Sequence, residues 1–286
     1  MAREEIAVVT GSSTGIGFET SLTLARNGFH TYATMRRLEG SKGSDYLTDM
    51  AKTENLPIQS IQLDVDNDNS VSEAINTIMK ERGRIDIVIN NAGYALAGPF
   101  EETSMAEIRA QFETNFFGAV RVMQAVIPKM REQRSGKIFN ITSMGGRIAV
   151  PLDSIYHGTK FALEGLSESL QYELEPFGIK FVLIEPGAVN SNFWRNLKIS
   201  SKTSSPDNIG SPYKQIVSNV SASFRQMEQN TIHPSEVAKV ILQAVLSANP
   251  DFRYVVGKDA VAFIEARRSM ADKEFQSLVK RQFNLQ

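Results

Sequence analysis

The sequence predicts a doubly wound α/β domain, in which helices cover both faces of one parallel sheet of about seven strands. Short apolar segments, typical of strands buried on both faces, alternate with amphipathic segments of helical period. The first apolar segment is followed by a glycine-rich turn and a helix, the usual opening of such sheets. The expected strands are 6–10, 31–35, 58–63, 85–89, 138–143, 179–184 and 252–256.

Composition limits the class of protein. The chain has 286 residues, 42% hydrophobic and 22% charged, with a net charge of −1, as expected for a globular protein with a single domain over 1–286. The balanced charge argues against nucleic acid or an anionic membrane as the main partner. There is no cysteine and only three scattered histidines, so we expect no disulfide and no metal site. No apolar run approaches about 18 residues, so we expect a cytoplasmic protein without a membrane span.

A glycine-rich loop joins the first strand to a helix expected at 18–27. It reads Gly11-Ser-Ser13-Thr14-Gly15-Ile16-Gly17. Such a loop can be a simple tight turn, but its place between strand and helix favours backbone N–H groups that bind a phosphate. The Gly-x3-Gly-x-Gly spacing differs from the general Gly-x-Gly-x-x-Gly fingerprint.

The second strand ends in Arg36-Arg37, about twenty residues after this loop. At that position an acidic residue binds the ribose 2′-hydroxyl of NAD, whereas arginine accommodates the 2′-phosphate of NADP. No carboxylate occurs before Glu39. The sequence therefore predicts NADP(H) rather than NAD, although a surface arginine is the simpler interpretation.

Two further strand ends offer ligand-binding positions. Asp64-Val65 follows the third strand, where Asp64 can accept the adenine amino group or cap the helix expected at 70–82. The fourth strand leads into Asn91-Ala92-Gly93, whose small side chains let a cofactor approach the backbone.

A long helix is predicted over 105–130, where apolar residues recur at steps of three and four. Pro128 should bend or end it. Asn115, at the edge of its apolar face, can be an ordinary buried asparagine bonded to backbone. It can also mark a kink that orders a water beside Lys160 and extends a proton path.

Another helix is predicted over 154–175, capped by Ser154 and closed by Pro176 and Gly178. A leucine stripe marks its buried face: Leu163, Leu166, Leu170 and Leu174. Tyr156 and Lys160 are four residues apart, so they share one face of this helix.

Tyr156 and Lys160 together suit proton transfer. A free phenol titrates near ~10 and is a poor acid at neutral pH, but a nearby ammonium group lowers that pKa. Ser143, at the end of the preceding strand, can hold the reacting oxygen. A second Tyr-x-x-x-Lys pair, Tyr254 and Lys258, begins in a strand-like segment where four residues span about 13 Å, and it has no serine thirteen residues upstream. We therefore favour the first pair.

Residues 188–233 are rich in serine and asparagine and poorly periodic, as in a substrate lid. A helix is expected from Pro234 to Leu246, and a tail of short helices over 258–286. The tail can cover the substrate, pair subunits or contact a membrane. The apolar side chains that suggest a pocket for a bulky or lipophilic ketone or alcohol are Tyr94, Leu96, Phe193 and Trp194.

These motifs together resemble the classical short-chain dehydrogenases/reductases over about 5–190. Residues 10–17 are similar to the family's cofactor loop and 90–93 to its mid-sheet motif. Residues 186–191 resemble its proline-glycine segment, with serine where threonine is usual. The residues that match its catalytic tetrad are Asn115, Ser143, Tyr156 and Lys160. The segments 32–36 and 253–257 further resemble the 17β-hydroxysteroid-dehydrogenase-like branch.

The resemblance implies a Rossmann fold and NADP(H)-dependent hydride transfer between a carbonyl and an alcohol, on a steroid-, retinoid- or acyl-like substrate. Ser143 and Tyr156 would bind the carbonyl oxygen, and Tyr156 would protonate the alkoxide. Lys160 would lower the pKa of Tyr156 and, with it, bind the nicotinamide ribose; Asn115 would hold a relay water. The remaining cofactor residues implied are Pro186, Gly187, Val189 and Ser191. A homodimer or homotetramer is expected, and the alternatives are a cofactor-binding protein without chemistry or an epimerase or dehydratase of the same fold.

Overall fold

The computed structural model describes residues 4–192, 196–208 and 210–285 of the chain. Seven parallel strands form one sheet in the order β3-β2-β1-β4-β6-β7-β9, which confirms the predicted fold class. They are β1 (Ile6–Val9), β2 (His30–Met35), β3 (Ile58–Gln62), β4 (Ile87–Asn90), β6 (Gly136–Ile141), β7 (Ile179–Pro186) and β9 (Arg253–Val256).

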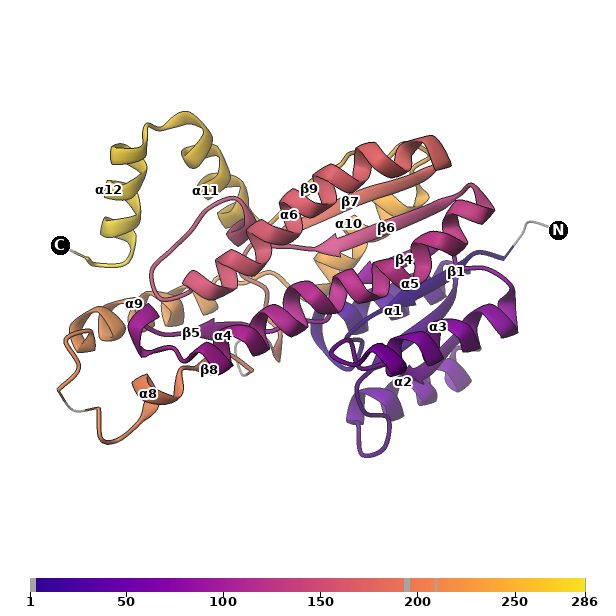
Figure 1. The fold of residues 1–286 in the computed structure, drawn as a ribbon, viewed down its shortest axis with the longest axis horizontal. Helices are drawn as coiled ribbons and strands as arrows, with labels where there is room; N and C mark the ends of the chain where they lie inside the picture. The colour runs from indigo at the N-terminus through magenta and orange to yellow at the C-terminus, as the bar shows by residue number, and fades with distance from the viewer. Residues whose placement is uncertain (1–3, 193–195, 209, 286) are drawn as a thin grey trace.

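Helices cover both faces of the sheet (Figure 1). Alternate side chains of β1 face opposite ways, as the pleat of a strand requires. Ile6 and Val8 join the core beneath three helices, whereas Ala7 and Val9 join the core on the other side. On the first face lie α3 (Asp68–Arg82), α5 (Gly118–Gln133) and α6 (Ser154–Leu174), and on the second lie α1 (Gly15–Arg26), α2 (Lys42–Thr53) and α10 (Pro234–Leu246).

The strand order reverses between β1 and β4. The chain proceeds from β1 outward to β2 and β3, and then returns to place β4 on the opposite side of β1. In open α/β sheets, ligands bind at the carboxyl ends of the strands beside such a reversal. The fold therefore locates the candidate site at this edge.

The helix predicted over 105–130 is interrupted at Asn115. It consists of α4 (Met105–Phe112), a single π-helical turn η2 (Glu113–Phe117) and then α5. A π turn inserts an extra residue into the helix, and such turns are frequent at functional sites. The irregularity expected at Asn115 is therefore present.

Of the two effects predicted for Pro128, a bend or an end of the helix, the end does not occur. Pro128 lies inside α5, which continues to Gln133. The side-chain amide of Gln133 accepts a bond from the N–H of Ile85 (3.1 Å) and donates one to its carbonyl (2.8 Å). Met130, also beyond the proline, is fully buried. These tertiary contacts outweigh the hydrogen bond that proline removes.

The helix that carries Tyr156 differs from the prediction at its start. Ser154 is the first residue of α6, and Asp153 occupies the N-cap position without a side-chain capping bond, so the predicted Ser154 cap is wrong. At the other end, η4 (Glu175–Phe177) leads to Gly178, whose φ of +73° ends the helix as expected. The leucine stripe faces the core. The start of α1 at Gly15 is likewise earlier than predicted.

The segment 188–233 is more regular than its composition suggested. It contains β8 (Lys198–Ile199), α8 (Ser201–Ser204) and α9 (Lys214–Glu228), and β8 pairs in parallel with β5 (Leu96–Ala97). The assignment of this whole segment as poorly periodic is therefore wrong. Inward-facing residues recur in α9 at steps of four, four and three: Ile216, Val220, Phe224 and Met227. Serine and asparagine between them obscured the pattern.

The tail forms the two expected helices, α11 (Lys258–Ser269) and α12 (Asp272–Gln282). Together with α9 they lie at the end of the molecule opposite the N-terminus (Figure 1). A small apolar core joins α9 and α12, in which the Phe224 and Phe283 rings meet edge to face at 5.6 Å. Short 3-10 turns, η1 (Phe100–Glu102) and η3 (Met144–Gly146), complete the described elements. No helix in the described ranges has the length and apolar character needed to cross a bilayer.

Candidate active site

A cavity of about 700 Å³ extends along the carboxyl ends of the central strands. The loops that follow β1, β2, β3, β4, β6 and β7 line it, and α9 and α11 close its far end. Its volume lies at the upper end of the range usual for small-molecule sites. The cavity therefore lies at the sheet edge that the strand order identifies as the ligand-binding edge.

The glycine loop forms one end of this cavity. Gly11 and Gly15 have φ of +68° and +63°, in the left-handed region that favours glycine. Gly17 is off the cavity wall, and a Cβ there would overlap the Gly11 carbonyl and the Asn91 amide. That amide donates to the carbonyls of Thr10 (2.8 Å) and Gly11 (3.1 Å). Gly17 thus shapes the loop rather than facing the cavity, and the Asn91 side chain braces the same loop.

The start of α1 is arranged as an anion site. Thr14, at the N-cap, makes no side-chain capping bond, so the first-turn N–H groups are left for a ligand. The loop residues predicted to hold phosphate that lie on the cavity wall are Gly11, Ser13, Thr14, Gly15 and Ile16.

Arg36 and Arg37 are placed differently. Arg36 is exposed on the cavity wall, and in the described part of the chain its guanidinium has no ion pair. Arg37 is also exposed but is not on the wall, so the structure favours Arg36 of the two for a cofactor phosphate.

Asp64 lies on the wall as predicted, but it does not cap α3. Its Oδ1 accepts a bond from the N–H of Asp66 at 3.2 Å, whereas the cap is Asn67, whose Oδ1 accepts from Ser70 N at 2.9 Å. The capping alternative for Asp64 is therefore wrong. The other predicted cofactor residues on the wall are Val65, Asn91, Ala92, Gly93, Pro186, Gly187, Val189 and Ser191.

Gly187 is required by a residue from the tail. A Cβ at Gly187 would overlap the carboxylate of Asp259, whose Oδ2 accepts a bond from the N–H of Ala188 at 2.7 Å. Asp259 in the first turn of α11 thus holds the backbone that follows β7. Asp259 and Ala188 are 71 residues apart, so no local sequence pattern could predict their contact.

Ser143, Tyr156 and Lys160 meet on the cavity wall, as predicted. The hydroxyl groups of Ser143 and Tyr156 are hydrogen-bonded to each other. The Ser143 Oγ also accepts from the N–H of Gly145 at 3.0 Å. The Lys160 Nζ lies 5.6 Å from the centroid of the Tyr156 ring and donates to the carbonyl of Ile141 at 2.8 Å. A hydroxyl, a phenol and an ammonium group are therefore gathered in one place.

The pKa of Tyr156 does not shift in the predicted direction. Burial raises the pKa of this phenol above its usual value near 10, the hydrogen bond from Ser143 opposes that shift, and the charge of Asp153 adds to it. Tyr156 is therefore protonated at neutral pH and can donate a hydrogen bond to a carbonyl oxygen.

The net shift of the Tyr156 pKa is upward because the effect of burial exceeds any lowering by Lys160. The Lys160 ammonium is engaged by the Ile141 carbonyl. Burial lowers the pKa of Lys160 itself to about 8, against the opposing effect of Glu164 one turn along α6. The predicted net lowering of the Tyr156 pKa is thus wrong for the protein without bound cofactor, although Tyr156 and Lys160 are neighbours.

Asn115 is buried and lies off the cavity wall. Its Nδ2 donates to the carbonyl of Tyr94 (2.8 Å) and to Oγ1 of Thr159 (3.3 Å), and its Oδ1 accepts from the N–H of Tyr94 (3.0 Å). This is the backbone-bonded arrangement considered above, and it joins the loop after β4 to α6. The relay water remains a prediction.

The substrate end of the cavity only partly matches the sequence analysis. Tyr94 lies on the wall, where Lys198 Nζ is 4.1 Å from its ring centroid. Leu96 is buried in β5 and does not reach the wall, so this assignment is wrong. Phe193 and Trp194 lie outside the described residues. The apolar side chains that do line this end are Met144, Ile148, Val150, Phe224, Met227 and Phe263.

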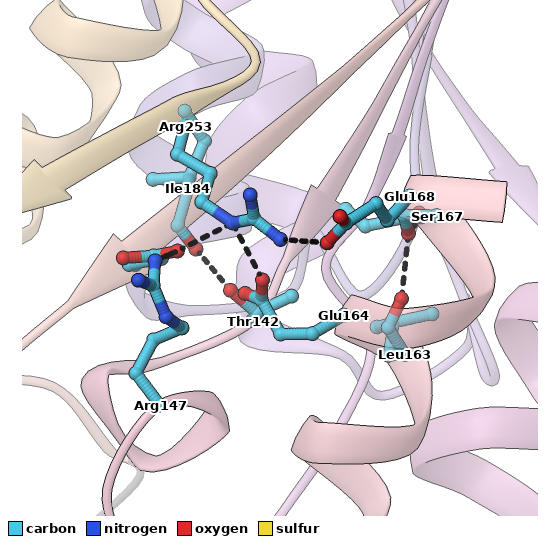
Figure 2. A network of polar contacts seen from close by, with 10 residues as sticks. Thr142, Arg147, Leu163, Glu164, Ser167, Glu168, Ile184 and Arg253 are labelled. Atoms are coloured by element: carbon cyan, nitrogen blue, oxygen red, sulfur yellow. Dashed lines mark hydrogen bonds and ion pairs between the residues drawn. The ribbon is translucent and has the colours of Figure 1, made fainter. Parts of the chain in front are cut away.

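A partly buried ionic network supports the helix that carries Tyr156 and Lys160 (Figure 2). Arg253 in β9 pairs with Glu164 (3.0 Å) and Glu168 (2.7 Å) of α6 and with Glu185 (3.3 Å) in β7. Arg147, from the loop after Ser143, also pairs with Glu185 at 3.1 Å. The Glu185 side chain is fully buried, so its charge depends on these two arginines. The network thus joins α6, the end of β7 and the serine loop.

The fold and a glycine-loop cleft at the strand-order reversal define the dinucleotide-binding class of α/β proteins. Residues 5–201 match the family model described as short chain dehydrogenase. The 3-ketodihydrosphingosine reductase of Bacteroides thetaiotaomicron is 34% identical over 273 residues, covering 95% of each chain. Retinol dehydrogenase 8 of Bos taurus is 37% identical over 255 residues, covering 86% of this chain and 79% of that protein. The chain belongs to the short-chain dehydrogenase/reductase family of oxidoreductases.

Solved structures agree with this assignment. A short-chain dehydrogenase from Streptomyces avermitilis has a TM-score of 0.80 at 30% identity, over the whole of both chains. The structure of ElxO with NADP bound has a TM-score of 0.73 at 26% identity, covering 91% of this chain and all of that one.

Arg253→Met should lower the free energy of unfolding by about 3–5 kcal/mol, because it removes the arginine that pairs with buried Glu164 and one of the two that pair with buried Glu185. Burial already raises the pKa of Glu185, and a carboxyl that binds its proton more readily in the folded state loses stability as pH rises. The loss should therefore be larger at about pH 8 than at about pH 5. Urea unfolding at both pH values measures it.

The matched control is Arg268→Met, which changes an exposed arginine without an ion pair in the described residues and should stay within about 0.5 kcal/mol of the wild type. Equal losses for the two variants would show that the network does not support the fold.

Proposed function

We propose that this protein interconverts a carbonyl and an alcohol by NADP(H)-dependent hydride transfer, on a bulky or lipophilic substrate. The observation that carries the proposal is the meeting of Ser143, Tyr156 and Lys160 on the wall of a cavity that begins at the glycine loop. Family membership supports an oxidoreductase that acts on CH–OH or carbonyl groups.

The residues present suit a dinucleotide with a 2′-phosphate. The left-handed glycines and the uncapped start of α1 offer N–H groups for the pyrophosphate. The guanidinium of Arg36 reaches the wall and has no ion pair within the described residues, so it can bind a phosphate. When bound, the cofactor supplies or accepts the hydride.

The protein residues provide orientation and a proton. Ser143 and Tyr156 would hold the carbonyl oxygen through their hydroxyl groups. Because burial keeps Tyr156 protonated, its hydroxyl can pass a proton to that oxygen as the oxygen gains negative charge. In the direction of alcohol oxidation, the phenolate oxygen of Tyr156 would receive the proton that the alcohol hydroxyl loses.

Lys160 would stabilise the phenolate that this transfer leaves. With a pKa of about 8, its amine is mostly charged at neutral pH, and it lies beside the phenol ring. A fixed positive charge in a buried site stabilises a developing negative charge more strongly than water does. Asn115 holds the loop and helix together, and we retain the relay water beside it as part of the proposal.

The substrate is proposed to be lipophilic because the far end of the cavity is apolar. Methionine side chains adapt to irregular shapes, and Phe224 and Phe263 come from α9 and α11, which close the far end of the cavity. Retinol and 3-ketodihydrosphingosine, which give two relatives their names, both carry long apolar chains. The lid formed by 188–233 and the covering role of the tail belong to this proposal.

We also infer a homodimer or homotetramer. Large apolar side chains are exposed on the helical face that includes η2 and α6, namely Phe117, Phe161 and Tyr172. Side chains of this kind are enriched at the centres of protein interfaces.

Tyr156→Phe should reduce NADPH-dependent turnover of ketones by at least about a hundredfold, because it keeps the ring and removes the proton donor. Loss of NADPH absorbance measures it across a panel of ketones, aldehydes and steroids. Tyr254→Phe, in the second Tyr-x-x-x-Lys pair and off the cavity wall, is the control and should retain activity. Near-wild-type turnover by Tyr156→Phe would refute its role as the acid.

The same panel separates the alternative functions. Binding of NADPH by the wild type without turnover of any carbonyl would indicate a cofactor-binding protein, and product formation without net consumption of NADPH would indicate an epimerase or dehydratase.

Arg36→Asp should lower the NADPH/NADH ratio of kcat/KM by about a hundredfold, because it replaces a phosphate-binding cation with a repelling carboxylate. Arg37→Asp makes the same change in charge off the cavity wall and should have a much smaller effect. An unchanged ratio in Arg36→Asp, or equal changes in both variants, would show that Arg36 does not bind the phosphate.

A further inference from the structure

Asp153 has an unusual environment at the substrate end of the cavity. It immediately precedes α6, and its side chain lies on the cavity wall. Although it stands at the N-cap position, its carboxyl makes no capping bond. The Oδ1 atom is completely buried and has no hydrogen-bond partner in the described part of the chain. Buried polar atoms are nearly always paired, so this carboxyl is suited to a ligand.

The neighbouring polar groups have other partners. The ammonium of Lys160 donates to the Ile141 carbonyl, and the Tyr156 hydroxyl is bonded to Ser143. His157 accepts at Nε2 from the N–H of Val150 (3.0 Å), so its Nδ1 carries the hydrogen and donates to the Gly145 carbonyl (2.9 Å). Burial lowers the pKa of His157, which keeps the ring neutral. Asp153 therefore faces no cation among the described residues.

The six apolar side chains named above, from Met144 to Phe263, form much of the wall at this end of the cavity. Tyr94 and Lys198 are also on the wall, and there the Lys198 Nζ lies over the Tyr94 ring at 4.1 Å from its centroid. Burial alone raises the pKa of Asp153 to about 7, in keeping with a carboxyl that lacks a charged partner. Asp153 and Tyr156 stand three residues apart at the start of one helix, and residues so spaced lie on the same face. The carboxyl is thus close to the hydroxyl that would hold the reacting carbonyl.

We propose that Asp153 binds a hydrogen-bond donor of the substrate, a hydroxyl or protonated amino group close to the reacting carbonyl, while the apolar wall holds a long hydrocarbon part. The proposal rests on the carbonyl-reducing function proposed above and specifies its substrate class. A bound ammonium group would also offset the negative charge that disfavours the phenolate of Tyr156. Recognition and catalysis would then favour the same substrates.

Three ketones with the same long alkyl chain test this proposal: one unsubstituted, one with a hydroxyl and one with an amino group on the carbon next to the carbonyl. Wild-type kcat/KM with NADPH should be about ten- to a hundredfold higher for the substituted ketones, because a hydrogen bond to a charged group contributes that much. In Asp153→Leu, of similar size and apolar, the preference should fall to about one while the unsubstituted ketone is still reduced.

Asp153→Asn keeps an acceptor oxygen and removes the charge, so it distinguishes the two donors. It should retain part of the preference for the hydroxyl ketone and lose the preference for the amino ketone. Asp49→Leu, the same change at an exposed position of α2, is the control and should retain both.

A wild type without preference for either substituted ketone, or an unchanged preference in Asp153→Leu, would overturn the proposal. If Asp153→Asn fully retains the preference for the amino ketone, the proposed ion pair between the Asp153 carboxylate and the substrate ammonium group is refuted. If the wild type consumes NADPH with none of the three ketones, the proposed function itself fails. If Asp153→Leu reduces the unsubstituted ketone and keeps the wild-type ratio of kcat/KM between substituted and unsubstituted ketones, only the role of Asp153 is refuted.

Discussion

The candidate site depends on the way Lys160 is buried. An ammonium group in a protein interior needs a partner, and here the Ile141 carbonyl at the end of β6 provides it. That bond fixes Lys160 beside the ring of Tyr156, and the preceding strand end delivers Ser143 to the same place. The sheet edge and the helix are therefore both needed to assemble the three groups. The network around Arg253 holds that helix against β7 and β9.

The two ends of the cavity are built in different ways. The cofactor end is made largely of backbone, in which Asn91 braces the glycine loop and Asp259 holds the chain after β7. The substrate end is made of apolar side chains, several of them from α9 and α11. Helix α9 is in turn held by the edge-to-face contact of Phe224 with Phe283, the residue after α12. Changes in the tail other than at Asp259 should thus alter the choice of substrate more readily than the binding of the cofactor.

The sequence predicted the sheet well, because parallel strands buried on both faces leave short apolar runs that amphipathic helices separate. It also predicted the meeting of Ser143, Tyr156 and Lys160, since spacing on one helix and position at a strand end are local properties. It could not predict the tertiary contacts of individual side chains. Lys160 donates to the Ile141 carbonyl, and Leu96 is buried within β5 instead of lining the cavity. Helix α9 was missed because serine and asparagine interrupt its apolar spacing, and the open carboxyl of Asp153 became visible only once its surroundings were known.

The central claim, that a charged Lys160 supports proton donation from Tyr156, is tested most directly by the pH dependence of kcat/KM for ketone reduction in the wild type and in Lys160→Met. Because Lys160 has a pKa of about 8 and Tyr156 stays protonated to higher pH, wild-type kcat/KM should be level below about pH 7.5 and fall above about pH 8. Lys160→Met should be slower by about a hundredfold or more and lack this fall. A wild-type profile that stays level to about pH 10, or a fall at the same pH in Lys160→Met, would contradict the account.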